Sequence, residues 1–106
     1  MKFHYRPAWL TDVAECADYL CTEAGEAVAA DWYQSLKKAL DHIQQVPEIG
    51  RLRRDLPQAD IRTLNLRKHP NYLVFYRLGT DSAGKGVIEL LRLRHGMLHL
   101  PDLFSE

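Results

Sequence analysis

Four arginines in the second half of the chain have the chemistry and spacing needed to bind an anion. Each lies in a segment where apolar residues recur at every second position, and each shares the phase of those apolar residues. The four residues are Arg62, Arg77, Arg92 and Arg94. A guanidinium group holds a carboxylate or phosphate through two parallel hydrogen bonds and stays charged when partly buried. If these alternating apolar positions all lie on one face of a sheet, the four arginines cluster at one edge of an apolar surface.

The phase of each arginine comes from its apolar neighbours. These are Leu64 and Leu66 for Arg62, Leu73 and Phe75 for Arg77, and Ile88 and Leu90 for Arg92 and Arg94. A second interpretation is that Arg62, Arg77 and Arg92 pair with helix carboxylates such as Asp12, Asp18 or Asp31, because unpaired buried charges are costly. Both interpretations remain open at the level of the sequence.

His95 directly follows the last arginine and precedes Gly96. Its titration range suits a general acid or base in phosphodiester cleavage. The other histidines and the two cysteines have no metal-ligand spacing, so we expect no metal site. The glycines between Leu78 and Val87 lie between strands with no helix after them, which argues against a nucleotide-binding loop and against a bound cofactor.

Charge is distributed unevenly, although the net charge of the chain is zero. Residues 1–49 carry four basic and eight acidic side chains, whereas residues 50–106 carry ten basic and six acidic ones. Such a split indicates a charged partner for one face, or an acidic helical half that neutralises a basic sheet half. The basic run Arg51-Leu52-Arg53-Arg54 suits nucleic acid, an acidic protein segment or solvent equally well.

The elements that position these residues belong to one domain, because 106 residues with a 46% hydrophobic fraction form one globule. A short strand is expected at Phe3–Tyr5. A helix follows, starting either at Pro7 or at a capping box formed by Asp12 and Glu15. The stripe expected to be buried on this helix is Leu10, Val13, Ala14, Ala17, Leu20 and Cys21.

Gly25 separates this helix from a second one, which ends before Pro47 and Gly50. Its expected stripe is Ala29, Trp32, Tyr33, Leu36, Leu40, Ile43 and Val46. We expect Trp9, Trp32 and Tyr33 to be core residues and not a stacking platform for bases. The two helices should form an antiparallel hairpin.

Three strands follow a loop over residues 50–60, and short turns should join them into an antiparallel meander. They are expected at Ile61–Arg67, Tyr72–Leu78 and Val87–Arg94. The last two have apolar residues in both phases, which is typical of strands covered on both faces. The helical hairpin covers one face, and the apolar tail behind Pro101 is the candidate cover for part of the other.

Nothing in the sequence indicates a membrane span or secretion. The longest apolar run, Tyr72–Tyr76, is far shorter than the ~20 residues that cross a bilayer, and the N-terminus lacks the apolar stretch of a signal peptide. We therefore expect a cytoplasmic protein with Cys16 and Cys21 as reduced thiols.

The order and spacing of these patterns, over about residues 3 to 104, are those of a known family. The matching features are Ala8 and Asp12 in the first helix, Ala29, Trp32, Leu36, Leu40 and Ile43 in the second, then Pro47, Gly50, Ile61-Arg62, Tyr72–Arg77 and Val87–Gly96. The chain resembles ParE toxins of the ParE/RelE superfamily of bacterial toxin–antitoxin systems. The resemblance implies an α+β fold of order β-α-α-β-β-β, with the helical hairpin on one face of a mainly antiparallel sheet and a short C-terminal tail or helix.

The resemblance also implies a cognate antitoxin that wraps and neutralises the toxin in a hetero-oligomer. ParE-like members inhibit DNA gyrase and stabilise its cleaved-DNA complex without catalysis, whereas RelE-like members are ribosome-dependent endoribonucleases that cut mRNA. A third alternative is an inactive domain that keeps only the antitoxin-binding surface.

RNA cleavage requires a base, an acid and cations around the phosphorus. The residues available for it are Arg62, Arg77, Arg92 and His95. A second proton-transfer group is missing, apart from His99, and the tail lacks the lysine and tyrosine typical of RelE-like enzymes. We therefore favour the gyrase inhibitor, with no catalytic residues and no sequence-specific contact with nucleic acid.

The expected binding residues fall into two sets. Antitoxin carboxylates are expected at Arg77, Arg92 and Arg94. The target-binding set is Arg94, His95, Leu98, Leu100, Leu103 and Phe104, because an apolar tail suits docking to a protein.

Overall fold

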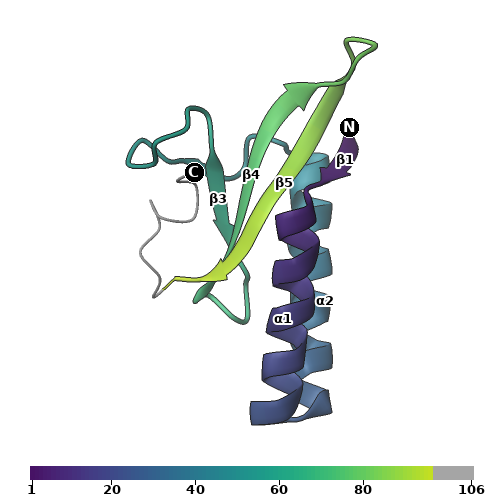
Figure 1. Ribbon diagram of the computed structural model, residues 1–106, viewed down its shortest axis with the longest axis vertical. Helices are drawn as coiled ribbons and strands as arrows, with labels where there is room; N and C mark the ends of the chain where they lie inside the picture. The colour runs from purple at the N-terminus through teal and green to yellow at the C-terminus, as the bar shows by residue number, and fades with distance from the viewer. Residues whose placement is uncertain (97–106) are drawn as a thin grey trace.

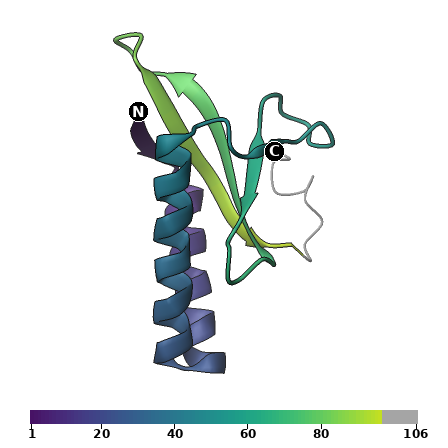
Figure 2. The same cartoon turned by 180° about the vertical axis from the view of Figure 1, so that it is seen from behind.

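The computed structural model describes residues 1–96 of the 106-residue chain. Its elements are β1 (Lys2–Tyr5), α1 (Pro7–Ala24), α2 (Glu26–Gln45), β2 (Arg51–Leu52), β3 (Arg62–Asn65), β4 (Tyr72–Thr80) and β5 (Gly86–His95). The strands form one sheet in the order β1-β5-β4-β3-β2, with β1 parallel to β5 and the other pairs antiparallel. The helical hairpin packs against one side of this sheet (Figures 1 and 2). The predicted α+β fold is confirmed, with β2 as an additional short strand inside the expected loop.

Helix α1 begins at Pro7, which decides between the two predicted starts. Arg6 is the N-cap residue, and no side chain caps the helix. Proline suits the first turn because its missing N–H has no partner to lose there. Asp12 is consequently an interior residue of the helix, and its side chain points into the protein with 3% exposure. The predicted capping box at Asp12 is therefore wrong.

The buried stripe of α1 agrees with the prediction only in part. Val13, Ala17 and Leu20 pack against the core as expected. Trp9 and Asp12 are buried, whereas Leu10 is 56% exposed and Cys21 is exposed. On α2, Trp32 is fully buried, but Tyr33 is 47% exposed, so its assignment to the core is wrong. The far ends of both helices project beyond the sheet (Figure 1), which leaves their apolar residues there without a layer to cover them.

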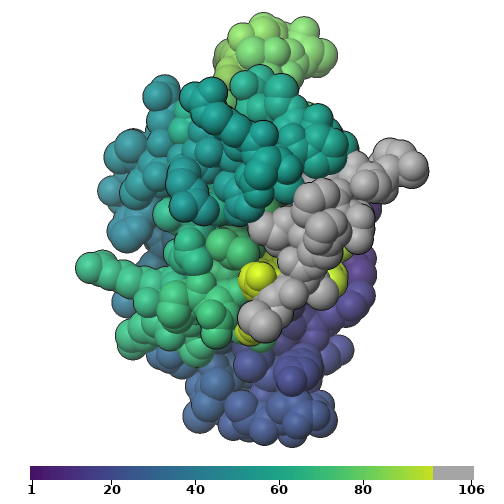
Figure 3. Space-filling view, turned by 90° about the vertical axis from the view of Figure 1, so that its left-hand side faces the viewer, coloured from purple at the N-terminus to yellow at the C-terminus, as the bar shows by residue number. Residues whose placement is uncertain are grey.

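Two apolar clusters form the core, one on each face of the sheet. The larger lies under the helices and contains Trp9, Trp32, Leu36, Ala39, Ile43, Leu66, Val74, Tyr76, Ile88, Leu90 and Leu93. The smaller lies on the opposite face and contains Leu56, Ile61, Leu73, Phe75 and Leu91. Figure 3 looks onto this opposite face, where the teal atoms of the segment between β2 and β3 lie over the sheet. The expectation of strands covered on both faces is confirmed, and the predicted contribution of the tail lies outside the described residues.

A β-bulge at Leu91 changes the phase of β5. Phe75 pairs with Arg92 and Tyr76 pairs with Leu90, so Leu91 is the extra residue in the ladder. Upstream, Ile88 and Leu90 face the helices; downstream, Leu93 does so instead. The predicted shared phase of Arg92 and Arg94 with Ile88 and Leu90 is therefore wrong, because side-chain direction alternates only where the ladder is regular.

Neither cysteine is in a disulfide, in agreement with the prediction. Burial raises the pKa of the Cys16 thiol to about 11, so this group is a neutral thiol at physiological pH. None of the described helices is both long and apolar enough to cross a bilayer.

Candidate functional site

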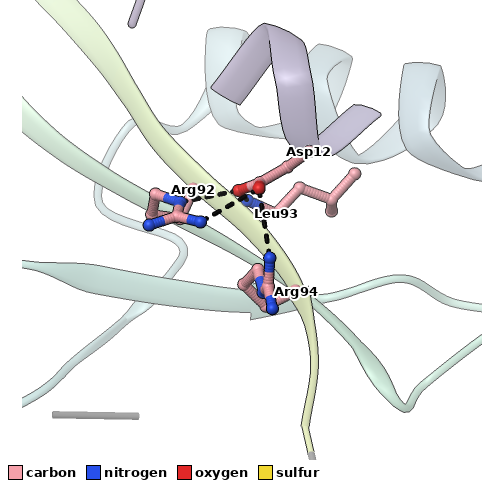
Figure 4. A network of polar contacts seen from close by, with 4 residues as sticks. All are labelled: Asp12, Arg92, Leu93 and Arg94. Atoms are coloured by element: carbon pink, nitrogen blue, oxygen red, sulfur yellow. Dashed lines mark hydrogen bonds and ion pairs between the residues drawn. The ribbon is translucent and has the colours of Figure 1, made fainter. Parts of the chain in front are cut away.

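Asp12 is the centre of a polar network that joins α1 to β5 (Figure 4). Its carboxylate accepts hydrogen bonds from Nε and Nη2 of Arg92 at 2.7 and 3.0 Å, and from Nη1 of Arg94 at 3.3 Å. It also accepts the backbone N–H of Leu93 at 3.0 Å. The bond to Asp12 raises the pKa of the Arg92 guanidinium, although partial burial opposes the shift. One buried carboxylate thus holds two guanidinium groups and one main-chain donor.

The network exists because β1 is shorter than β5. The parallel pairing of the two strands ends where Tyr5 meets Leu90, and the N–H of Arg6 donates to the carbonyl of Leu90. The chain then turns into α1, which leaves the outer edge of β5 without a strand from this point onward. Asp12 fills the place of that strand at Leu93, where an unpaired buried N–H would be costly.

A second network lies on the sheet face that points away from the helices. Glu89 accepts hydrogen bonds from Nη2 of Arg77 at 2.9 Å and from Nη2 of Arg6 at 3.0 Å. Arg77 and Glu89 are cross-strand partners, as are Phe75 and Arg92. Burial alone would raise the pKa of Glu89, but the hydrogen bonds and charges of the two arginines lower it overall.

The lowered pKa of Glu89 predicts an acid-sensitive contribution to stability. Because the folded pKa lies below the ordinary value of 4.5, this contribution is present above that value and is lost as pH falls through the folded pKa. Glu89→Gln should therefore cost about 1 kcal/mol at neutral pH and little at the acid end. Urea unfolding of both proteins across this pH range measures the difference; a difference independent of pH would contradict the assignment.

The structure brings three of the four predicted arginines to one sheet face and leaves the fourth on the other. Arg77, Arg92 and Arg94 share the face of Leu73 and Phe75, as their cross-strand pairing shows. Arg62 pairs across the sheet with Tyr76, on the helix side. Its Nη1 donates to the backbone carbonyls of Glu48 and Gly50 at 3.1 and 2.9 Å. The cluster at one rim therefore contains three arginines and not four.

A groove of about 710 Å³ lies between α1 and the end of β5, beside the Asp12 network. Its lining is Asp12, Glu15, Cys16, Tyr19, Leu20, Glu23, Ala24, Tyr72, Arg94 and His95. The His95 ring meets the Tyr72 ring edge-on at 5.3 Å, and Tyr72 meets Trp32 in the same way at 5.6 Å. Arg94 and His95, both predicted to bind the target, thus meet at this groove, whereas Leu98, Leu100, Leu103 and Phe104 lie outside the described residues.

The four residues considered for RNA cleavage do not share one site. Arg62 and His95 belong to the helix-side rows of the sheet, whereas Arg77 and Arg92 belong to the opposite rows. Arg92 is already bound to Asp12. Within residues 1–96, no group of His, Cys, Asp and Glu side chains is arranged to hold a metal ion.

Sequence reasoning missed Glu89 and gave Asp12 the wrong primary role. For Asp12 a signal was present, because it lies three residues after Trp9 and directly before Val13, in a stripe that faces the core. A polar residue in such a stripe requires a partner. The second of the two interpretations, pairing with a helix carboxylate, is confirmed for Arg92 with Asp12. It is wrong for Arg77, whose acidic partner is Glu89 of β5.

The fold and site together define a small α+β protein whose arginine-rich sheet face is partly neutralised from within. Residues 3–97 match the family described as the ParE toxin of type II toxin–antitoxin system, parDE. The chain belongs to this family, and a cognate antitoxin partner is implied by it. No curated protein matches the sequence.

Among solved structures, the chain is similar to one titled "Chromosomal ParDE TA system from P. aeruginosa". The TM-score is 0.71 at 20% sequence identity, and the alignment covers 90% of this chain and 95% of the other. At this identity the similarity establishes a common fold and no more.

Proposed function

We propose that this toxin inhibits DNA gyrase by binding it and stabilising its cleaved-DNA complex, in the cytoplasm, and that its cognate antitoxin neutralises it. The observation that carries the choice of a non-catalytic action is that, among the four residues considered for RNA cleavage, only His95 lines the groove beside α1. The three arginines are held elsewhere: Arg62 by the carbonyls of Glu48 and Gly50, Arg77 by Glu89 and Arg92 by Asp12. Charge stabilisation and proton transfer at one phosphorus need groups within hydrogen-bonding reach of it. A protein that acts by binding has no such requirement.

The arginine face supports binding to an acidic antitoxin segment. Arg92 and Arg94 share the single carboxylate of Asp12, and Arg77 and Arg6 share that of Glu89. Among residues 1–96, each network therefore holds two guanidinium groups around one carboxylate. Antitoxin carboxylates at Arg77, Arg92 and Arg94 would complement these guanidinium groups and speed association at low salt.

The groove beside α1 supports a protein target. It combines the exposed ring of Tyr19 and the side chains of Leu20 and Tyr72 with the charged Arg94 and the ring of His95. Aromatic and arginine side chains next to apolar surface are enriched among residues that dominate protein–protein binding. We assign Arg94 and His95 to the gyrase contact on this basis.

Purified toxin should convert supercoiled plasmid into gyrase-linked broken DNA after detergent and protease treatment, while ribosome-bound mRNA stays intact. Arg94→Gln should require about tenfold more toxin for the same breakage, because it removes a charged anchor from the groove. Lys85→Gln, at the tip of the β4–β5 hairpin, is the control with an equal change of charge.

Two results would reverse the proposal. If the toxin cut mRNA while gyrase turnover stayed normal, the protein would act as a RelE-like endoribonuclease and not as a gyrase inhibitor. Antitoxin binding without either effect would identify an inactive binding domain, and growth arrest after induction in cells separates that outcome from both toxic ones.

A further inference from the structure

The groove beside α1 is acidic along its helical wall. Glu15 and Glu23 line this wall, and Tyr19, with 58% exposure, lies midway between them in the sequence of α1. Steps of four along a helix place these three side chains in one row, and the helix rises by about 12 Å from the first carboxylate to the second. Neither glutamate forms an ion pair within residues 1–96. We call Glu15, Tyr19 and Glu23 the acidic row.

The negative charge extends over this whole end of the helical hairpin. Residues 7–36 carry six carboxylates and no lysine or arginine. Asp12 is paired with Arg92 and Arg94, whereas both carboxylates of the acidic row are exposed. Such a surface repels nucleic acid and anionic lipid. By charge complementarity, the partner of this wall is a protein segment that carries lysine or arginine.

The floor of the groove is apolar. Cys16 and Leu20 from α1 and Tyr72 from β4 are partly buried and pack against the main core. The Tyr72 ring is fixed from two sides, by Trp32 and by His95. A fixed ring beside half-buried apolar side chains forms a preorganised seat for an apolar group of a partner. The groove therefore fits an apolar side chain held between two basic ones.

The shape of the groove favours a helix over a strand. Its α1 residues follow at steps of three and four from Asp12 to Ala24, so they form one helix face of about three turns. Main-chain pairing with the edge of β5 is blocked at Leu93, whose N–H donates to Asp12. The far end of α1 projects beyond the sheet (Figure 1). A partner helix can pack its own rows of side chains against this uncovered surface.

We propose that the groove beside α1 binds an amphipathic helix of gyrase that carries two basic side chains eight positions apart and an apolar side chain midway between them. The basic groups meet Glu15 and Glu23. The apolar side chain contacts Tyr19, Leu20 and Tyr72. This inference rests on the proposed gyrase inhibition and adds the chemistry of the contact. The acidic antitoxin segment proposed for the arginines of the sheet has the opposite charge, so the two partners are assigned to different surfaces.

The first test uses the full chain and an alanine-based helical peptide with lysine at positions i and i+8 and leucine at i+4. Nuclear magnetic resonance should show shifts of the backbone amides of Tyr19 and Tyr72, and the affinity should fall as salt rises. A peptide with glutamate in place of both lysines should bind at least about tenfold more weakly. Equal affinities of the two peptides, or shifts confined to other residues, would overturn the proposal.

The second test removes the two carboxylates of the acidic row. Glu15→Gln with Glu23→Gln should weaken binding of the lysine peptide by about tenfold. Asp18→Asn with Asp41→Asn is the matched control, because these two carboxylates are exposed on the same helices but do not line the groove. The control should change the affinity by no more than about twofold. Equal losses in both double variants would show attraction without a site and would overturn the proposal.

All four of these side chains are exposed, so both double variants should melt at nearly the same temperature as the unmodified toxin. In the gyrase assay, Glu15→Gln with Glu23→Gln should require about tenfold more toxin for the same DNA breakage, while the affinity for the antitoxin stays unchanged.

The gyrase assay separates this proposal from the proposed function. Unchanged breakage by the Glu15→Gln, Glu23→Gln variant would overturn the assignment of the groove to gyrase and leave gyrase inhibition standing. A loss of antitoxin affinity as large as the loss of breakage would assign the groove to the antitoxin and would also overturn the proposal. Failure of the unmodified toxin to break DNA would reject gyrase as the target, whereas binding of the lysine peptide would still support a site for a basic helix.

Discussion

Asp12→Ala is expected to lower the free energy of unfolding by about 3 kcal/mol, the largest effect of any single polar substitution described here. The variant loses the charge-assisted bonds to Arg92 and Arg94 and leaves the buried N–H of Leu93 without its acceptor. The two guanidinium groups keep 22% and 29% of their side-chain surface exposed. Water can therefore reach them, which keeps the cost below that of a fully buried orphan charge.

Chemical denaturation with urea measures this loss, and the melting temperature should fall by roughly 15 °C. Asp12→Asn keeps an acceptor for Leu93 without the charge, so it should cost roughly half as much. Asp31→Ala removes a carboxylate that is paired but half exposed, so it should leave the free energy of unfolding nearly unchanged. If the Asp12 and Asp31 variants were equally stable, the edge of β5 would not depend on Asp12.

Gly50→Ala is expected to cost about 2 to 3 kcal/mol through crowding and not through backbone strain. A Cβ atom at Gly50 would lie 2.6 Å from both Cε1 and Oη of Tyr76, a fully buried ring. That hydroxyl accepts the N–H of Gly50 at 2.7 Å and donates to the carbonyl of Pro47 at 2.8 Å. The ring cannot move aside without breaking both bonds, so the connection between α2 and β2 must deform.

Gly79→Ala is the matched comparison, because its Cβ would come no closer than 3.2 Å to Oε1 of Glu89 and 3.9 Å to Cγ2 of Val87. We expect a change below about 1 kcal/mol for this variant. Thermal unfolding of the two variants under one set of conditions compares them directly. Equal stabilities would mean that the segment from Pro47 to Gly50 relaxes freely. The two hydrogen bonds of the Tyr76 hydroxyl would then not fix this segment.

The order of helices and strands was predictable because each element has a strong period in the sequence. The continuous apolar run of Tyr72–Tyr76 between turn signals and the steps of three and four from Trp32 to Ile43 depend on local burial alone. Strand β2 was missed because two residues carry no period. The exposure of Leu10 and Tyr33 was also missed, because the buried faces of the two helices contain the adjacent Trp9 and Trp32, which turns Leu10 and Tyr33 toward the outside.

The geometry of the arginine face could be predicted only in part. Arg77 follows a regular strand, so its face was correctly assigned with Leu73 and Phe75. Arg92 and Arg94 lie beyond an inserted residue that has no distinctive sequence signal, since Leu91 continues a run of leucines. The position of Asp12 depends on where β1 ends relative to β5, which is a property of the whole fold.

The inserted residue Leu91 divides β5 into two halves whose outer edges contact different parts of the protein. The first half is matched to β1, and the second to the Asp12 carboxylate. A relative that lacks this residue could keep the same cross-strand pairs and the same side-chain directions in a regular ladder, because Leu91 is the residue without a partner on β4. In an alignment, a gap at Leu91 therefore preserves the face on which Arg92 and Arg94 lie, whereas a one-residue gap at a regularly paired position of β5 would move the residues beyond it to the other face.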